Sequence, residues 1–174
     1  AETGEILWKV KRNTEALAES GAAYASVVAV PTYGDIIVAG GDAITAHDKE
    51  NGKELWRTDF TTKRKKNWRL VATPTAFEVT RSGYSFIFAA PRGLWLSRYN
   101  VSKKPEAEIK EIWQEKSKKM PDVCSPLIYK DLVIVVNGRD RWLTALDTKD
   151  GQKLWQKRLP VSTPIRATPK GADG

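Results

Sequence analysis

Two stretches of the chain share one spacing pattern, and this pattern decides the fold. Residues 46–56 read AHDKENGKELW, and residues 145–155 read ALDTKDGQKLW. Each stretch holds an Ala, an Asp two positions later, a Gly four positions after the Asp, and a Leu-Trp pair at its end. A partial third copy occupies residues 2–8, which read ETGEILW. A repeat of this kind predicts an array of similar units, each packed on the next.

The glycine of each repeat predicts the turn of a β-hairpin. Asn51-Gly52 and Asp150-Gly151 are pairs favoured in two-residue type I′ turns, because both central positions of that turn need positive φ. The residues on both sides alternate in polarity, as expected for strands with one buried face. Each repeat is therefore predicted to form two antiparallel strands joined by a tight turn.

The Asp and Trp residues of the repeat have structural roles in this prediction. Asp48 and Asp147 precede the turns, and we expect their carboxylates to accept hydrogen bonds from nearby backbone or Trp N–H groups. Trp56 and Trp155 occupy one position of the second strand, where a repeated large aromatic side chain fills the space between stacked sheets. We expect both Trp side chains to be largely buried between units, each near the turn of its own repeat.

A second pair of strands precedes each hairpin. Residues 27–39 and residues 125–136 each hold two apolar runs around a short polar turn. Two hairpins make a four-stranded antiparallel unit of about 40–45 residues, the size of one propeller blade, whose strands we name A to D in chain order. The sequence thus predicts an all-β chain with blades at 23–60, 69–116 and 123–159, the end of a preceding blade at 1–10 and the start of a further blade at 161–174.

The middle blade departs from the repeat. Its C–D hairpin is longer than the others and lacks the Asp and the Gly. Ile109, Ile112 and Trp113 also have the spacing of an apolar helix face, so a helix within 106–119 is the alternative to strand D. We favour the strand, because Trp113 keeps the phase of the repeat.

The Ala, Asp, Gly and Trp spacing resembles the signature of the pyrroloquinoline-quinone (PQQ)-like propeller repeat, with Asn51 and Asp150 at the place of its Thr. The resemblance covers nearly the whole chain and identifies the repeated Trp residues with a tryptophan docking motif. Related propellers mostly have seven or eight blades, so the three blades are expected to be part of a larger ring, with sequence missing on both sides. The resemblance also implies a bacterial protein in the periplasm or another extracytoplasmic compartment.

Similar proteins include both enzymes and scaffolds. Quinoprotein alcohol and glucose dehydrogenases hold PQQ with an adjacent cysteine pair, a stacked Trp and a Ca²⁺ ion, and they use an Asp as base. The propeller lipoprotein of the outer-membrane β-barrel assembly machinery binds no cofactor. The alternatives for this chain are therefore a part of a dehydrogenase acting on alcohols or sugars, and a non-enzymatic binding or scaffold module.

The chain lacks the cysteine pair of the enzymes. It has one cysteine, Cys124, and one histidine, His47, and packing inside strands explains these two better than a nucleophile pair does. We expect no catalytic residue, no PQQ and no metal within these residues. PQQ with Ca²⁺ elsewhere in the complete ring belongs to the dehydrogenase alternative, as does cofactor stacking by Trp68, Trp95 or Trp142.

We favour the binding or scaffold module, because of where the charge lies. In a four-stranded meander, the D–A and B–C connections lie at one end of the blade. These connections hold nine basic and five acidic residues, so half of the formal net charge of +8 belongs to this end. A basic surface attracts an anionic partner, such as an anionic polysaccharide, a phosphate-bearing ligand or an acidic protein. The predicted partner-binding residues are Lys63, Arg64, Lys65, Lys66, Arg92, Arg139 and Arg141.

The alternative interpretation of residues 63–66 is a solvated loop without a partner. The charge also permits nucleic-acid binding, but the sequence holds no recognised nucleic-acid-binding motif, and we do not expect it. The longest apolar runs, such as residues 132–136, have the length of strands, so no membrane insertion is expected.

Overall fold

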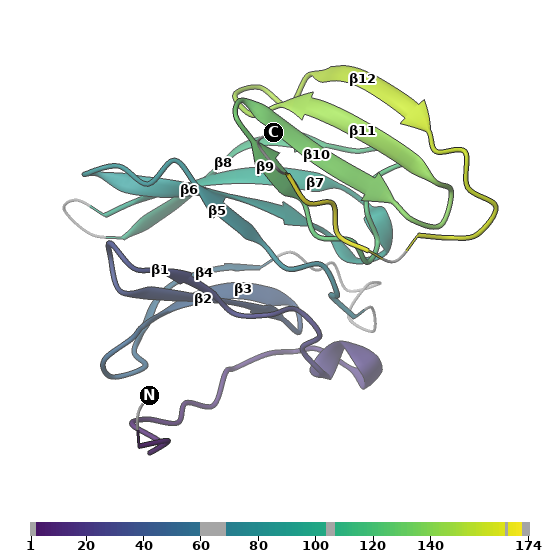
Figure 1. The fold of residues 1–174 in the computed structure, drawn as a ribbon. Coiled ribbons are helices and arrows are strands. Elements are labelled where there is room, and N and C mark those ends of the chain that lie inside the picture. Colours follow the sequence, from purple (N-terminus) through teal and green to yellow (C-terminus); the bar gives the residue numbers. More distant parts are fainter. Residues whose placement is uncertain (1–2, 60–68, 104–106, 166, 172–174) are drawn as a thin grey trace.

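The computed structural model describes residues 3–59, 69–103, 107–165 and 167–171. This part of the chain forms three four-stranded antiparallel sheets (Figure 1), which confirms the all-β prediction. Two 3-10 helices, η1 (Ala18–Gly21) and η3 (Pro91–Gly93), are the only helices in the described ranges. No helix there is long and apolar enough to cross a membrane.

In each sheet the strands follow one another in chain order, as a meander. Sheet 1 contains β1 (Val28–Val30), β2 (Asp35–Gly40), β3 (Ala43–Asp48) and β4 (Glu54–Asp59). Sheet 2 contains β5 (Thr75–Phe77), β6 (Gly83–Ala89), β7 (Leu96–Ser102) and β8 (Glu108–Glu115). Sheet 3 contains β9 (Leu127–Tyr129), β10 (Leu132–Asn137), β11 (Trp142–Asp147) and β12 (Lys153–Arg158). The stretch with ambiguous spacing is therefore strand β8, not a helix.

The described parts of the two flanking ranges, 1–10 and 161–174, contain no strand. A strand needs a neighbouring strand for its backbone hydrogen bonds, and no other strand in the described part of the chain pairs with these segments. Residues 3–10 instead lie along sheet 1, and Ile165 donates one backbone hydrogen bond to Gly138 at 2.8 Å.

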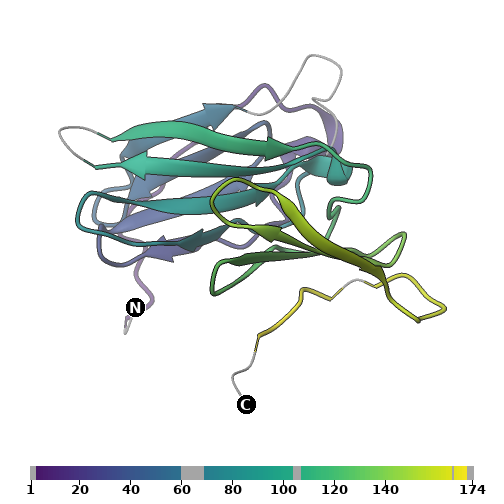
Figure 2. The same cartoon turned by 90° about the horizontal axis from the view of Figure 1, so that it is seen from above.

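Sheet 2 lies between the other two sheets (Figures 1 and 2). Its one face shares a core with sheet 1, in which Ile37 and Ile44 meet Phe86. Its other face shares a second core with sheet 3, in which Ile87 and Val133 are fully buried. Successive residues of β6 point to opposite faces of sheet 2, so Phe86 belongs to the first core and Ile87 to the second.

The repeat turns are longer than predicted. Gly52 has φ +74°, but Asn51 does not have positive φ, and five residues separate β3 from β4. The carboxylate of Asp48 accepts hydrogen bonds from the N–H groups of Glu50 (2.7 Å) and Asn51 (3.3 Å), while its carbonyl accepts one from Gly52 (2.8 Å). These bonds stabilise a wider turn than type I′, which explains why the two-residue prediction was wrong.

The second repeat turn is built in the same way. The carboxylate of Asp147 accepts a hydrogen bond from the N–H group of Lys149 at 2.7 Å. The N–H group of Gly151, which has φ +74°, donates to the Asp147 carbonyl at 3.1 Å. Both turns therefore depend on an Asp carboxylate and on a glycine in the left-handed region.

A Trp ring from the preceding repeat packs on each of these glycines. Trp8 donates from Nε1 to the Lys49 carbonyl at 2.8 Å, and its ring covers Gly52, where a Cβ would lie 2.5 Å from Trp8 Cε3. Trp113 donates to the Thr148 carbonyl at 2.9 Å and covers Gly151 in the same way. The Trp of one repeat thus packs on the turn of the next repeat, and the prediction that it packs near its own turn was wrong.

Trp56 uses a different partner, because sheet 2 lacks the Asp and Gly of the turn. Its ring is 5% exposed and stacks on Phe86 with centroids 5.4 Å apart. Its Nε1 donates to the Tyr84 hydroxyl at 3.1 Å, and that hydroxyl donates to Asp35 Oδ2 at 2.8 Å. A Tyr hydroxyl thus replaces the backbone carbonyl as acceptor.

Trp155 is more exposed than the sequence analysis predicted. Its strand position matches that of Trp56, since Ala145 pairs with Trp155 as Ala46 pairs with Trp56. Its side chain is nevertheless 37% exposed, because no further sheet in the described part of the chain covers that face of sheet 3.

Candidate ligand-binding site at the loop face

The meander brings six connections of the chain to one edge of the stacked sheets. They are the B–C connections (residues 41–42, 90–95 and 138–141), the described parts of the D–A connections (69–74 and 116–126), and the segment before β1 (11–27). We call this edge the loop face. Loops at one edge of a rigid scaffold are common places for binding residues.

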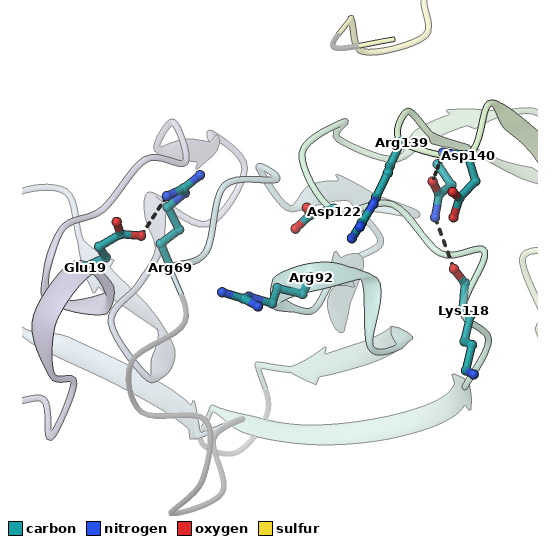
Figure 3. A pocket seen from close by; sticks show the side chains of 8 residues that line it. Glu19, Arg69, Arg92, Lys118, Asp122, Arg139 and Asp140 are labelled. Carbon is teal, nitrogen blue, oxygen red and sulfur yellow. Dashed lines mark hydrogen bonds and ion pairs between the residues drawn. The ribbon is translucent and has the colours of Figure 1, made fainter. Parts of the chain in front are cut away.

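A cavity of about 260 Å³ opens on the loop face (Figure 3). All three sheets contribute to it, because the described residues that line it lie before β1, at the end of β10 and in the connections β4–β5, β6–β7, β8–β9 and β10–β11. They are Glu19, Arg69, Arg92, Lys118, Asp122, Asn137, Arg139 and Asp140. We call it the loop-face cavity.

The turn η3 places Arg92 at the rim of the loop-face cavity. Arg92 has φ +57° and Gly93 has φ +63°, so two successive residues adopt the left-handed conformation. A Cβ at Gly93 would clash with the Met120 carbonyl, so this B–C connection packs directly on the next D–A connection. Left-handed backbone at a residue other than glycine costs about 1–3 kcal/mol, and Glu78, Lys130 and Arg141 adopt it in other turns of the chain.

Asn137 fixes the other side of the loop-face cavity. Its side chain is buried, and its Nδ2 donates to the carbonyls of Lys118 (3.2 Å) and Met120 (3.0 Å). Its Oδ1 accepts a hydrogen bond from the N–H group of Asp140 at 2.9 Å. The amide therefore ties one connection to the next and holds Arg139 and Asp140 at the cavity wall.

Ionic side chains of both signs face one another in the loop-face cavity. Arg69 Nη1 and Glu19 Oε2 form an ion pair at 2.7 Å on one side. Figure 3 shows the side chains of Arg139 and Asp122 pointing into the middle of the cavity. A guanidinium donates up to five N–H bonds and a carboxylate only accepts them, so the cavity offers donors and acceptors together.

The predicted partner-binding residues are brought together only in part. Arg92 and Arg139 line the loop-face cavity. Arg141 does not: it donates from Nη1 to the Val161 carbonyl at 2.6 Å, and so holds the segment after β12. The remaining four, at 63–66, lie outside the described residues. Arg69 and Asn137 were not among the residues predicted from the sequence, because nothing in their local pattern separates them from ordinary loop residues.

Asp42, in the B–C connection of sheet 1, does not face the loop-face cavity as Asp140 does. Its carboxylate accepts hydrogen bonds from the Thr14 hydroxyl at 2.7 Å and the Glu15 N–H group at 2.9 Å. Burial acts to raise the pKa of Asp42, but these hydrogen bonds outweigh it and hold the pKa below its usual value. Asp42 therefore anchors the segment before β1.

The residues of the loop-face cavity do not fit a quinone cofactor with its metal ion. Among the described residues, no aromatic side chain lines the cavity: Trp95 packs against the core of sheets 1 and 2, and the ring centroid of Trp142 lies 4.0 Å from Lys119 Nζ. Trp68 lies outside the described residues. The Asn137 amide is already engaged, and no group of three His, Cys, Asp or Glu side chains in the described ranges could hold a metal ion.

The single His and the single Cys have separate structural surroundings. His47 is buried in β3, with Nδ1 2.9 Å from the Gly52 carbonyl and Nε2 3.0 Å from Thr45 Oγ1. Cys124 is buried in the connection before β9, not in a strand as predicted, and its thiol contacts the Ile165 carbonyl at 3.9 Å. One residue lies in sheet 1 and the other in the connection between sheets 2 and 3, and they form no pair.

Comparisons with known proteins agree with this architecture. The model of a family described as outer membrane protein assembly factor BamB matches residues 1–93 and 99–172. The structure is similar to BamB from Moraxella catarrhalis, with 18% identity, a TM-score of 0.59 and coverage of 98% of this chain and 45% of that chain. It is also similar to the quinohemoprotein alcohol dehydrogenase ADHIIG from Pseudomonas putida HK5, with 15% identity, a TM-score of 0.61 and coverage of 87% and 22%.

A second enzyme of this class, the quinohemoprotein alcohol dehydrogenase from Comamonas testosteroni, is similar with 17% identity, a TM-score of 0.55 and coverage of 80% and 21%. No curated protein sequence matches the chain significantly. The chain spans less than half the length of each of these solved structures, and at these identities the likeness concerns the fold alone.

Proposed function

Because the chain belongs to the family of outer membrane protein assembly factor BamB, we propose that it is part of a non-enzymatic propeller module that binds an anionic partner through its loop face. Its setting in this proposal is an extracytoplasmic compartment of a bacterium, where such assembly factors act. The partner is an anionic polysaccharide, a phosphate-bearing ligand or an acidic protein. The three sheets serve as the rigid support of the binding loops.

The loop-face cavity is the observation that supports this proposal best. Connections from all three sheets supply its walls, so its shape depends on the whole stack and not on one mobile loop. Two arginines predicted from the sequence, Arg92 and Arg139, line it together with Arg69 and Lys118. Basic side chains gathered in a concave surface raise the local concentration of an anionic partner and speed its association.

The dehydrogenase alternative has support from the fold, since the structure is similar to two quinohemoprotein alcohol dehydrogenases. The chemistry of the loop-face cavity favours the binding module instead. The chain has one cysteine and so has no adjacent cysteine pair, and the described residues of the cavity include no aromatic side chain to stack on a flat cofactor. A quinone site would have to be built by other parts of a larger ring.

Charge reversal on the two ends of the sheets tests the proposal. The double variant R92E/R139E removes positive charge from the loop-face cavity. The matched control K53E/K149E makes the same change in net charge at exposed C–D turns, at the opposite end of the sheets. Association with three probes is measured, namely polygalacturonate, polyphosphate and polyglutamate, at low and at high ionic strength.

We expect at least one probe to bind, and R92E/R139E to slow its association by about tenfold at low ionic strength. High ionic strength should reduce this difference, because exposed charges are screened over about 8 Å in physiological salt. The control should bind like the unmodified protein. Binding of no probe, or an equal loss in both double variants, would show that the loop face has no such role. Stoichiometric PQQ with turnover of an alcohol or a sugar would replace the proposal by the dehydrogenase alternative.

A further inference from the structure

The loop-face cavity contains acids among its bases, and this mixture restricts the ligand. Carboxylates in a site for a simple anion lower the affinity of the site, because each one repels the charge of the ligand. Of the described residues that line the cavity, four are basic and three are acidic, namely Glu19, Asp122 and Asp140. The acidic residues therefore need an explanation of their own.

Ion pairing inside the protein explains only one of the three acids. Glu19 is paired with Arg69 at 2.7 Å. In the described part of the chain, the carboxylates of Asp122 and Asp140 accept no hydrogen bond and form no ion pair. The guanidinium of Arg139 likewise donates no hydrogen bond and forms no ion pair there. The cavity thus holds two unengaged acceptors and one unengaged bidentate donor at its wall.

The ligand that satisfies these groups carries both an anion and hydroxyl groups. A guanidinium binds a carboxylate through two parallel N–H bonds, whereas a carboxylate can only accept a bond from a donor such as a hydroxyl. A phosphate monoester carries a charge of about −1.5 to −2 at pH 7 on acceptor oxygens, so Asp122 and Asp140 would repel it without binding it. A monocarboxylate with hydroxyl groups carries a smaller negative charge than the phosphate monoester, and its hydroxyl groups can donate to Asp122 and Asp140.

We propose that the loop-face cavity binds a sugar acid, a single sugar ring with one carboxylate, and this inference rests on the proposed function and names its ligand. The carboxylate of the sugar acid accepts hydrogen bonds from Arg139, and its hydroxyl groups donate to Asp122 and Asp140. The volume of about 260 Å³ lies below the range of about 300–1,000 Å³ for drug-sized ligands and suits one ring. An adjoining cavity of about 170 Å³ shares Asp122 and Arg139 and gives room for the next unit of a polysaccharide.

Titration with three small probes tests the ligand class. Amide chemical shifts of the protein are followed while glucuronate, glucose or inorganic phosphate is added. We expect saturable shifts with glucuronate in residues of the loop face, and at least tenfold weaker binding of glucose and phosphate. Glucose lacks the carboxylate, and phosphate lacks the ring hydroxyl groups and carries more charge for Asp122 and Asp140 to repel. Equal binding of phosphate and glucuronate would overturn the inference.

Removal of one carboxylate distinguishes a sugar acid from a bare anion by the sign of its effect. Asp122→Ala should weaken glucuronate binding by about tenfold, since a hydroxyl acceptor is lost. The same change should strengthen phosphate binding, since a repelling charge is lost. Asp140→Ala should act in the same direction. Asp131→Ala removes an exposed acid from the A–B turn of sheet 3, at the opposite end of the sheets, and should change neither affinity.

The outcomes separate this inference from the proposed function. Tighter glucuronate binding by Asp122→Ala would show that the cavity is a simple anion site, so the sugar-acid inference fails while the anionic partner remains. Absence of glucuronate binding, together with polyanion binding that R92E/R139E reduces, would lead to the same conclusion. Absence of binding by any probe would remove both. Thermal unfolding of each variant shows whether a lost affinity reflects a lost fold.

Discussion

Trp56 and Trp155 occupy the same position of the repeat in different surroundings, and their truncation should give different losses of stability. The two variants are Trp56→Ala and Trp155→Ala in the 174-residue chain. Trp56 is 5% exposed and stacked on Phe86, whereas Trp155 is 37% exposed. Both residues pair with an alanine in the neighbouring strand, so the local backbone is the same in the two variants that are compared.

The expected magnitudes follow from the buried area. A buried Trp loses about 150 Å² of contact on truncation, which at about 25 cal/mol per Å² gives about 4 kcal/mol, within the range of about 3–5 kcal/mol for such changes. Trp155 keeps about two thirds of the burial of Trp56. Its open side leaves no sealed cavity, so Trp155→Ala should cost about 2 kcal/mol.

Urea unfolding followed by far-UV circular dichroism measures both losses. The free energies are compared at a common slope, since a change in slope would indicate a change in the unfolding reaction itself. Equal losses for the two variants, or a loss below about 1 kcal/mol for Trp56→Ala, would refute the assignment of Trp56 to the core between sheets 1 and 2.

Three further predictions follow from single residues. Gly52→Ala should destabilise the protein by more than about 1 kcal/mol in thermal unfolding, because Gly52 has φ +74° and lies under a Trp ring, whereas Gly21→Ala should be nearly neutral, since nothing lies within 4 Å of its Cβ position. Burial raises the pKa of Tyr99 to about 12. In the unfolded chain this phenol ionises near pH 10, so its contribution to the free energy of unfolding is complete below pH 10 and is lost as the pH rises to about 12. Unfolding at a series of alkaline pH values should therefore show that the stability of Tyr99→Phe falls less steeply with pH than that of the unmodified protein. Asp48→Ala should cost about 0.5–2 kcal/mol in urea unfolding, as for loss of a capping carboxylate, and an effect no larger than that of the exposed control Glu50→Ala would contradict its role in the turn.

The repeat was enough to predict the all-β architecture, because a hairpin turn and alternating strands are local signals. The pairing of Trp8 with the turn at Gly52 was not predictable in the same way, since it joins positions more than 40 residues apart. The sequence shows which residues recur, but the stacking direction decides whether a Trp reaches its own turn or the next. The exposure of Trp155 likewise depends on which sheets lie beside it.

The candidate site was predictable only at the level of the loop face. The order of four strands in a meander places B–C and D–A connections together, so Arg92 and Arg139 could be assigned to one end from the sequence. The distinction between Arg139, which points into the cavity, and Arg141, which binds the Val161 carbonyl, depends on two side-chain directions in one short turn. Asn137 could not be predicted, because its side chain binds backbone carbonyls, and such a role needs neither a charge nor a recognisable motif in the sequence.

The central claim is that the loop face, and not the opposite end of the sheets, is the binding surface. Hydrogen–deuterium exchange of the protein with and without polygalacturonate tests it most directly, because exchange reports protection segment by segment. The claim predicts protection in residues 90–95, 116–126 and 138–141, around Arg92, Asp122 and Arg139, with unchanged exchange in the C–D turns at 49–53 and 148–152. Protection of the C–D turns with none at the loop face would contradict it.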